Sequence, residues 1–207
     1  MNLFYLRSLL CASIICAFFS SADCSNHVIF SKKEKNLIET GDSTMHLYVN
    51  TNKKELKLLR KKSHNLDFSM LQTAEYQQLK QRMHHTVKDP GHPGVGIAAP
   101  QVGISRKLVA VQRFDKTDKP FEFYPNIEII QMSDTSQIGP EGCLSVPNRR
   151  GLVKRASNIK IRYMSENTGE WKEECISGFT AVIFQHEVDH LSGILYIDKL
   201  ENEISDK

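Results

Sequence analysis

The stretch QHEVDHLSG, residues 185–193, decides how the rest of the sequence is interpreted. It completes a mostly apolar run, residues 180–191, that is typical of a buried helix, and Gly193 follows where such helices usually end. On a helix, His186 and His190 lie one turn apart on the same face, so both imidazoles can reach one ion. The alternative is a helix that happens to carry two histidines, so the metal site needs a third ligand elsewhere.

Glu187 lies beside the two histidines on the same helix. A carboxylate at this spacing is placed to take a proton from a water molecule and later deliver it to a leaving nitrogen. The helix therefore predicts a metal-dependent hydrolase of amide bonds.

The third metal ligand is expected upstream of the helix. In one large class of metalloproteases it is a histidine six positions after the second, but that position is Tyr196 here. In another class it is a glutamate on a later helix, and Glu201 follows His190 too closely for that helix. The loop PEGCLSVP, residues 140–147, offers Cys143, a soft thiolate that suits zinc or ferrous iron. Two imidazoles and one thiolate leave a position open for water, although Cys143 could also be a buried structural thiol.

A small-residue segment, GVGIAAPQVG at residues 94–103, is the next candidate. Gly94 and Gly96 lack the third glycine of a dinucleotide-binding loop, so that kind of site is excluded. Small residues here would let a peptide lie against the backbone. Gln101 could donate its amide to a developing oxyanion.

Composition sets the class of protein. The 207 residues are 40% hydrophobic and 25% charged, which predicts one globular catalytic domain. A net charge of +3 with only 8% aromatic residues gives no nucleic-acid-binding surface, and a small or peptidic substrate fits better.

The N-terminal segment is interpreted as a targeting signal. A weakly positive start precedes an apolar run too short to span a bilayer, and small residues follow it. We expect a signal peptide at residues 1–22, an N-terminal extension packed on the domain at 23–65, and the catalytic domain at 66–207. A buried N-terminal helix and lipidation of Cys24 are the alternatives. Among the remaining cysteines, Cys175 follows a strand-like pattern and is predicted to be in the core.

The order of predicted elements favours an α+β fold rather than a βαβ array. We expect a helix over residues 66–87 with Ser69 as its cap. The basic run at residues 53–63 is expected to be a solvated face with its leucines turned inward. Strands are predicted at residues 108–111, 121–124, 127–130, 159–163 and 171–176, the last two as a hairpin, with a strand-like tail at 194–197.

Three segments together, GVGIAAPQ, EGCLS and QHEVDH, resemble the peptide deformylases, which carry such motifs in this order. The resemblance covers roughly residues 66–200. It implies mixed and antiparallel β-sheets packed around a central metal-binding helix that carries the HExxH motif. It also implies a monomer that removes the formyl group from N-formylmethionyl peptides and releases formate.

The resemblance also implies roles for individual residues. The metal would be ferrous iron, or zinc or nickel, bound by Cys143, His186 and His190. Glu187 would be the general acid and base, and Gln101 with the backbone amide of Leu144 would form the oxyanion hole. The residues expected to bind substrate are Gly96, Val95, Arg150, Phe179, Val182 and Ile183. Glu141 and Arg155 match a buried ion pair that braces the metal loop.

Two features depart from the family pattern. Tyr124 precedes Pro125 where many members have Asn-Pro. The signal-like segment predicts an exported or periplasmic protein, whereas the family is normally cytoplasmic. An exported metallopeptidase and a non-catalytic metal- or peptide-binding homologue are therefore the competing functions. Loss of Glu187 or Gln101 would favour the non-catalytic homologue, and both residues are present.

Overall fold

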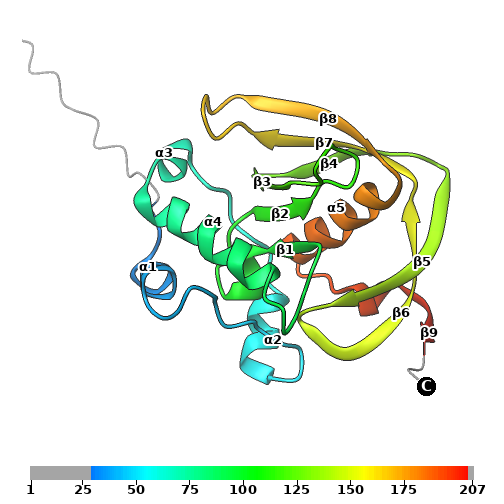
Figure 1. Ribbon diagram of the computed structural model, residues 1–207, viewed down its shortest axis with the longest axis horizontal. Coiled ribbons are helices and arrows are strands. Elements are labelled where there is room, and N and C mark those ends of the chain that lie inside the picture. The colour runs from blue at the N-terminus through cyan, green and yellow to red at the C-terminus, as the bar shows by residue number, and fades with distance from the viewer. Residues whose placement is uncertain (1–28, 205–207) are drawn as a thin grey trace, which may run out of the picture.

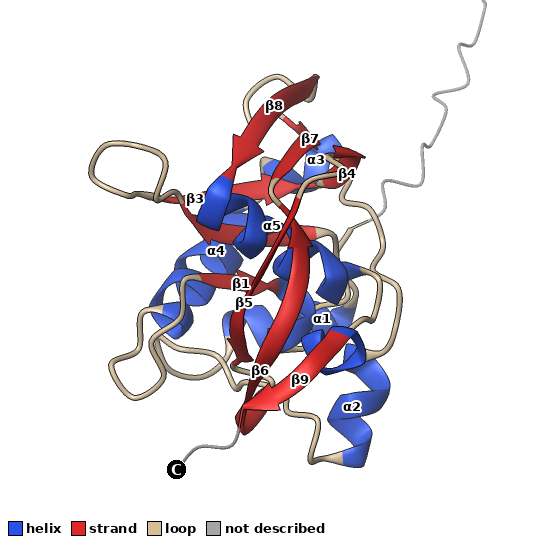
Figure 2. Cartoon of the chain, turned by 90° about the vertical axis from the view of Figure 1, so that its right-hand side faces the viewer, coloured by secondary structure: helices blue, strands red, loops and turns tan. Residues whose placement is uncertain are grey.

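The strands of the computed structural model, which describes residues 29–204, form three antiparallel sheets of three strands each (Figures 1 and 2). The strands are β1 (Gly96–Ala98), β2 (Leu108–Gln112), β3 (Phe121–Pro125), β4 (Glu128–Met132), β5 (Ser136–Cys143), β6 (Val146–Ala156), β7 (Asn158–Met164), β8 (Trp171–Ser177) and β9 (Leu200–Ile204). The sheet orders are β1–β2–β3, β4–β7–β8 and β5–β6–β9. Helices combined with antiparallel sheets confirm the predicted α+β class.

The helices complete the fold. They are α1 (Lys32–Glu39), α2 (Lys53–Leu59), α3 (Phe68–Leu71), α4 (Ala74–Val87) and α5 (Gly178–Leu191), with the 3₁₀ helices η1 (Ala99–Val102) and η2 (Tyr196–Lys199). Helix α5 contacts strands of all three sheets. Within residues 29–204, no helix is long and apolar enough to cross a membrane.

Residues 108–111 of strand β2 are buried on both faces, because they form an unbroken apolar run. Leu108 and Ala110 pack into the core that contains α4, whereas Val109 and Val111 pack into the core that contains α5. The sheet β1–β2–β3 therefore lies between α4 and α5 (Figure 1). This arrangement places β1, with Gly96, directly against α5.

Residues 29–65, which precede the region with the motifs, contribute to the core that contains α4. Phe30, Ile38 and Met45 are buried in the same cluster as Leu79 and Met83 of α4. The predicted signal peptide at residues 1–22, and Cys24, lie outside the described residues.

The predicted helix over residues 66–87 is wrong in one respect, because it is two helices, α3 and α4. Thr73 separates them, and its hydroxyl accepts a hydrogen bond from the backbone N–H of Tyr76 at 3.2 Å, which caps α4. Ser69, the predicted cap, lies inside α3. Threonine side chains compete with the helical backbone for such bonds, which favours a helix start over a helix interior.

The five predicted strands are confirmed as β2, β3, β4, β7 and β8, and β7 pairs with β8 as a hairpin. Strands β1, β5, β6 and β9 were not predicted. The predicted strand-like tail at residues 194–197 is wrong, because η2 begins at Tyr196 and the last strand, β9, begins only at Leu200. Cys175 is also not in the core. Its neighbour Ile176 faces the interior, so Cys175 is exposed on the opposite face of β8.

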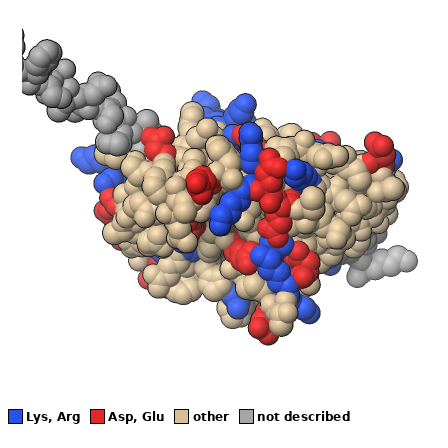
Figure 3. Space-filling view, turned by 90° about the horizontal axis from the view of Figure 1, so that it is seen from above, with Lys and Arg blue, Asp and Glu red and all other residues tan. Residues whose placement is uncertain are grey.

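The face that carries β7 and β8 shows basic and acidic side chains interleaved (Figure 3). Lys160 pairs with Glu173 at 2.6 Å, and Arg162 pairs with Glu128 at 2.7 Å. These pairs are partly exposed, so each contributes at most about 1 kcal/mol to stability. Neither sign of charge dominates this face.

Replacement of Gly193 by alanine is expected to destabilise the fold. Gly193 has φ of +73°, and a Cβ atom there would lie 2.4 Å from the carbonyl oxygen of Arg60. The left-handed conformation alone costs about 1–2 kcal/mol for a residue with a side chain. Urea unfolding should show that Gly193→Ala lowers the free energy of unfolding by at least this amount. Gly139→Ala is the control, because a Cβ at Gly139 meets no atom within 4 Å; equal stability of the two variants would contradict the argument.

Candidate active site

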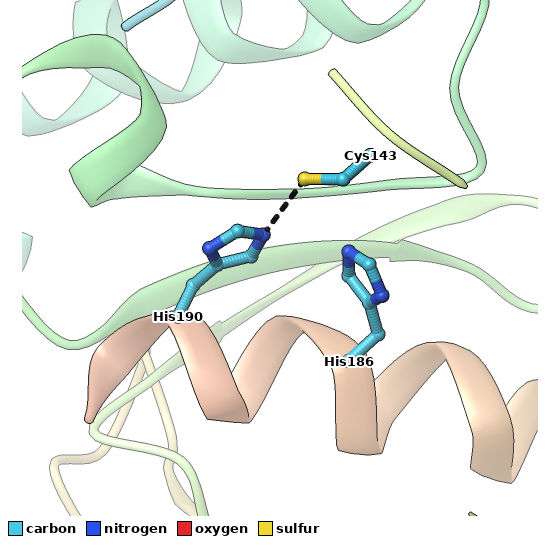
Figure 4. Close-up of side chains that lie close together, drawn as sticks. All are labelled: Cys143, His186 and His190. Atoms are coloured by element: carbon cyan, nitrogen blue, oxygen red, sulfur yellow. Dashed lines mark hydrogen bonds between the residues drawn. The ribbon is translucent and has the colours of Figure 1, made fainter. Parts of the chain in front are cut away.

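Cys143, His186 and His190 come together between the end of β5 and the buried face of α5 (Figure 4). One potential ligand atom from each residue lies within 4.8 Å of the other two. Cys143 Sγ is 3.3 Å from His190 Nε2. The helical spacing of the histidines and the approach of the Cys143 sulfur from β5 thus produce one compact cluster of nitrogen and sulfur donors.

The donor set of this cluster fits a transition-metal ion. Two imidazoles and one thiolate match sites for zinc or ferrous iron, and three protein ligands leave a position open. His186 Nδ1 is 2.8 Å from Glu141 Oε2, so its Nε2 is the nitrogen left to bind an ion. His190 is buried, and its Nδ1 has no hydrogen-bond partner among the described residues. The ligand role falls to His190 Nε2, because this nitrogen and not Nδ1 faces the sulfur of Cys143.

A buried ion pair braces the cluster. Arg155 donates to Glu141 through Nε at 2.7 Å and Nη2 at 2.9 Å, and to Asp189 through Nη1 at 2.5 Å. Burial opposes ionisation of Glu141, but the hydrogen bonds from Arg155 and His186 lower its pKa to about 2. Glu141 is therefore a carboxylate at neutral pH and orients the His186 ring. The sequence pattern did not single out Asp189 for this contact.

Glu187 is buried one position after His186. Its Oε2 has no hydrogen-bond partner within the described part of the chain, and burial raises its pKa to about 7. Gly96 of β1 faces it so closely that a Cβ atom at position 96 would lie 2.5 Å from Glu187 Oε1. A carboxyl group with this pKa can accept and donate a proton near neutrality.

The side-chain amide of Gln101 has a defined orientation. Its Oε1 accepts a hydrogen bond from the backbone N–H of Ala98 at 2.8 Å. Its Nε2 therefore points the other way, and lies 3.3 Å from Ser145 Oγ and 3.6 Å from Cys143 Sγ. The amide N–H groups thus face the cluster, as an oxyanion donor requires.

The segment between α1 and α2 connects the two loops of the site. The backbone N–H of Tyr48 donates to the carbonyl of Gln101, and that of Asn50 donates to the carbonyl of Ser145, each at 2.8 Å. No motif in the sequence points to either residue, because backbone hydrogen bonds leave no side-chain pattern.

Tyr196 occupies the position where one class of metalloproteases has its third histidine, and here it contacts a candidate ligand. Its ring stacks on that of His186, with centroids 6.0 Å apart and planes inclined by 22°. Its hydroxyl donates to the carbonyl of Arg149 at 2.8 Å. Tyr196 therefore covers one side of a candidate ligand.

A cavity of about 540 Å³ opens beside the cluster. It is lined by all of the expected site residues except His190, which lies next to Cys143: Val95, Gly96, Gln101, Cys143, Leu144, Arg150, Phe179, Val182, Ile183, His186 and Glu187. Val95 and Phe179 are exposed, whereas Ile183 is buried. The cavity is therefore open to solvent on one side and reaches the cluster on the other.

Comparisons with known proteins identify the family. The model of the polypeptide deformylase family matches residues 48–205. A peptide deformylase of Leptospira biflexa is 38% identical over 152 residues, which is 70% of this chain and 83% of that protein. Among solved structures, a class I type b peptide deformylase of Acinetobacter baumannii with bound Met-Ala-Ser is 35% identical, with a TM-score of 0.66. That match covers 76% of this chain and 98% of the Acinetobacter chain. The peptide deformylase of Thermotoga maritima is 31% identical with a TM-score of 0.65, over 76% of this chain and 98% of its own.

The family model extends over most of the chain, and residues 48–205 include all three motifs around the cavity. The chain belongs to the polypeptide deformylase family.

Proposed function

We propose that this protein removes the N-formyl group from N-formylmethionyl peptides and releases formate. The observation that carries the proposal is the buried carboxyl group of Glu187, whose Oε2 has no hydrogen-bond partner among the described residues, beside the Cys143, His186 and His190 cluster at one cavity. The relative solved with Met-Ala-Ser binds a peptide that begins with methionine, the product expected of this reaction.

Cys143, His186 and His190 are proposed to hold one divalent metal ion. Peptide deformylases are metalloenzymes, and the thiolate favours ferrous iron, with zinc and nickel as alternatives. When bound, such an ion acts as a Lewis acid toward water and the formyl oxygen. Glu141 keeps His186 in the tautomer that this role requires.

Glu187 is proposed to perform both proton transfers. It accepts a proton from the attacking water and then donates it to the amine nitrogen as the bond to the formyl carbon breaks. The amide of Gln101 and the backbone N–H of Leu144 are proposed to stabilise the oxyanion that forms between these steps.

The peptide is proposed to lie along the backbone of β1, with Gly96 as a hydrogen-bonding partner. Its methionine side chain would enter the part of the cavity lined by Val95, Phe179, Val182 and Ile183, and Arg150 would face the peptide. A long, unbranched thioether fits irregular apolar surfaces well.

The alternative functions are not favoured. Burial of a carboxyl oxygen without a hydrogen-bond partner, as at Glu187 Oε2 among the described residues, lowers the stability of the fold. A non-catalytic homologue would gain nothing from this loss of stability. An internal peptidase does not agree with family membership over residues 48–205.

Formate release tests the proposal directly. Protein loaded with iron under anaerobic conditions should release formate from formyl-Met-Ala-Ser. Glu187→Ala should reduce the rate about 10²- to 10⁴-fold, because it removes the general acid and base. Metal content measured by elemental analysis should not change. No formate from the wild-type protein under these conditions would refute the deformylase function.

Gly96→Ala tests whether close packing against β1 positions Glu187. The new methyl group must displace the carboxyl group, and a misplacement of about 1 Å can cost about 100-fold in rate. We expect kcat to fall about 10- to 100-fold with full metal content. Gly139→Ala, where the methyl group meets no atom within 4 Å, should retain wild-type kcat. Equal kcat in both variants would show that Gly96 does not position Glu187.

Glu141→Gln tests the brace behind His186. Loss of the negative charge weakens the hydrogen bond that orients the imidazole, so metal affinity should fall about 10- to 100-fold. Competition with a chelator measures the metal affinity, at a temperature where circular dichroism shows that the variant and the wild-type protein are both folded. Glu170→Gln, at an exposed glutamate, is the matched control. Unchanged affinity in Glu141→Gln would exclude the bracing role.

A further inference from the structure

The loop between β2 and β3, residues 113–120, brings an additional aromatic residue to the edge of the cavity. It projects from the sheet where β2 ends and β3 begins (Figure 2). Phe114, which is partly buried, packs edge-to-face against Phe179, with ring centroids 5.2 Å apart and planes inclined by 62°. Phe179 lines the cavity, whereas Phe114 is not among the residues that line it and contacts Phe179. Nothing in the motifs of the chain points to Phe114.

Phe179 depends on such support for a fixed position. It lies in the first turn of α5, directly after Gly178, and 54% of its surface is exposed. A largely exposed aromatic side chain can change rotamer unless a neighbour restricts it. The ring of Phe114 supplies an edge-to-face contact, which is a favourable geometry for two aromatic rings.

The backbone that carries Phe114 is firmly held on both sides. The guanidinium of Arg113 is 1% exposed and donates to Asp115 at 2.6 Å and to Glu174 of β8 at 2.6 Å. It also donates to the hydroxyl of Tyr124 in β3 at 2.6 Å. The backbone N–H of Arg113 donates to the carbonyl of Pro120, which closes the base of the loop. Phe114 is therefore a rigid support and not a mobile loop residue.

We propose that Phe114 is a specificity-determining positioning residue of this enzyme. Phe114 holds the Phe179 ring as a fixed wall and so limits the width of the side chain that enters at the first residue of the formyl peptide. A narrow, unbranched side chain such as methionine fits beside this wall, whereas a wide aromatic side chain must displace it. The inference rests on the proposed function, because it concerns the selectivity of the same cavity.

Removal of the Phe114 ring should let Phe179 rotate and widen the cavity. Methionine then loses a wall that it contacts, and a wider side chain gains room. The metal ligands and Glu187 are not touched by this change, so KM should respond and kcat should not.

The test compares formyl-Met-Ala-Ser with formyl-Phe-Ala-Ser for Phe114→Ala, Phe114→Leu and Phe179→Ala. In Phe114→Ala, KM for the methionine peptide should rise about 3- to 10-fold, the effect of one aromatic pair, with kcat unchanged. The Met-to-Phe ratio of kcat/KM should fall by at least the same factor. Phe114→Leu should restore part of that ratio. The double variant Phe114→Ala/Phe179→Ala should have the same Met-to-Phe ratio as Phe179→Ala alone, because Phe114 acts through Phe179.

Phe68→Ala is the control, because Phe68 is also a partly exposed phenylalanine but packs on Gly169, away from the cavity lining. It should leave the Met-to-Phe ratio unchanged. An equal fall of kcat/KM for both peptides in Phe114→Ala, or additive effects in the double variant, would overturn the proposal.

Binding of the unformylated peptides separates this inference from the proposed function. Calorimetry with Met-Ala-Ser and Phe-Ala-Ser needs no turnover, and the affinity ratio should shift in Phe114→Ala as the kinetic ratio does. Absence of formate release by the wild-type protein would refute the deformylase function alone. An unchanged affinity ratio would refute the role of Phe114 alone.

Discussion

The site depends on one buried set of hydrogen bonds, those that join Glu141, Arg155 and His186. These residues belong to β5, β6 and α5, so the bonds fix the helix that carries the histidines against the hairpin that carries Cys143. A buried ion pair of this kind adds little net stability, because desolvation offsets its attraction. What the ion pair does here is to hold the His186 ring and the Cys143 hairpin in a fixed relative position. Loss of one partner would leave a buried charge and would also free the imidazole that it orients.

The rest of the molecule supports this arrangement by burying α5. Strand β2 is apolar on both faces, so the sheet β1–β2–β3 can lie between α4 and α5. That position brings Gly96 against Glu187 and buries most of the carboxyl group, and this burial raises its pKa to about 7. The same packing that stabilises the core thus gives Glu187 its acid-base properties.

The two loops around the cluster and the wall of the cavity are held by segments without chemical motifs. Tyr48 and Asn50 bind the carbonyls of Gln101 and Ser145, and the loop that carries Phe114 supports Phe179. Strong backbone and ion-pair contacts fix these supports, while the cavity itself stays open to solvent. Rigid supports behind an open cavity are expected where a peptide must be aligned with little loss of binding energy.

The sequence by itself determined the elements with a clear period and the groups with distinctive chemistry. The spacing of His186 and His190 defines one face of a helix, and elimination left Cys143 as the third candidate ligand. Tertiary structure decided the rest. It placed Cys175 on the exposed face of β8. The break of the long helix at Thr73 is instead a local effect, because the Thr73 hydroxyl caps α4 three residues away and the hydrophobic period does not record such a cap. Tertiary structure also brought Tyr48, Asn50, Asp189 and Phe114 to the site through backbone bonds and long-range contacts. Such contacts depend on where the chain returns in space, and no local pattern of side chains records that.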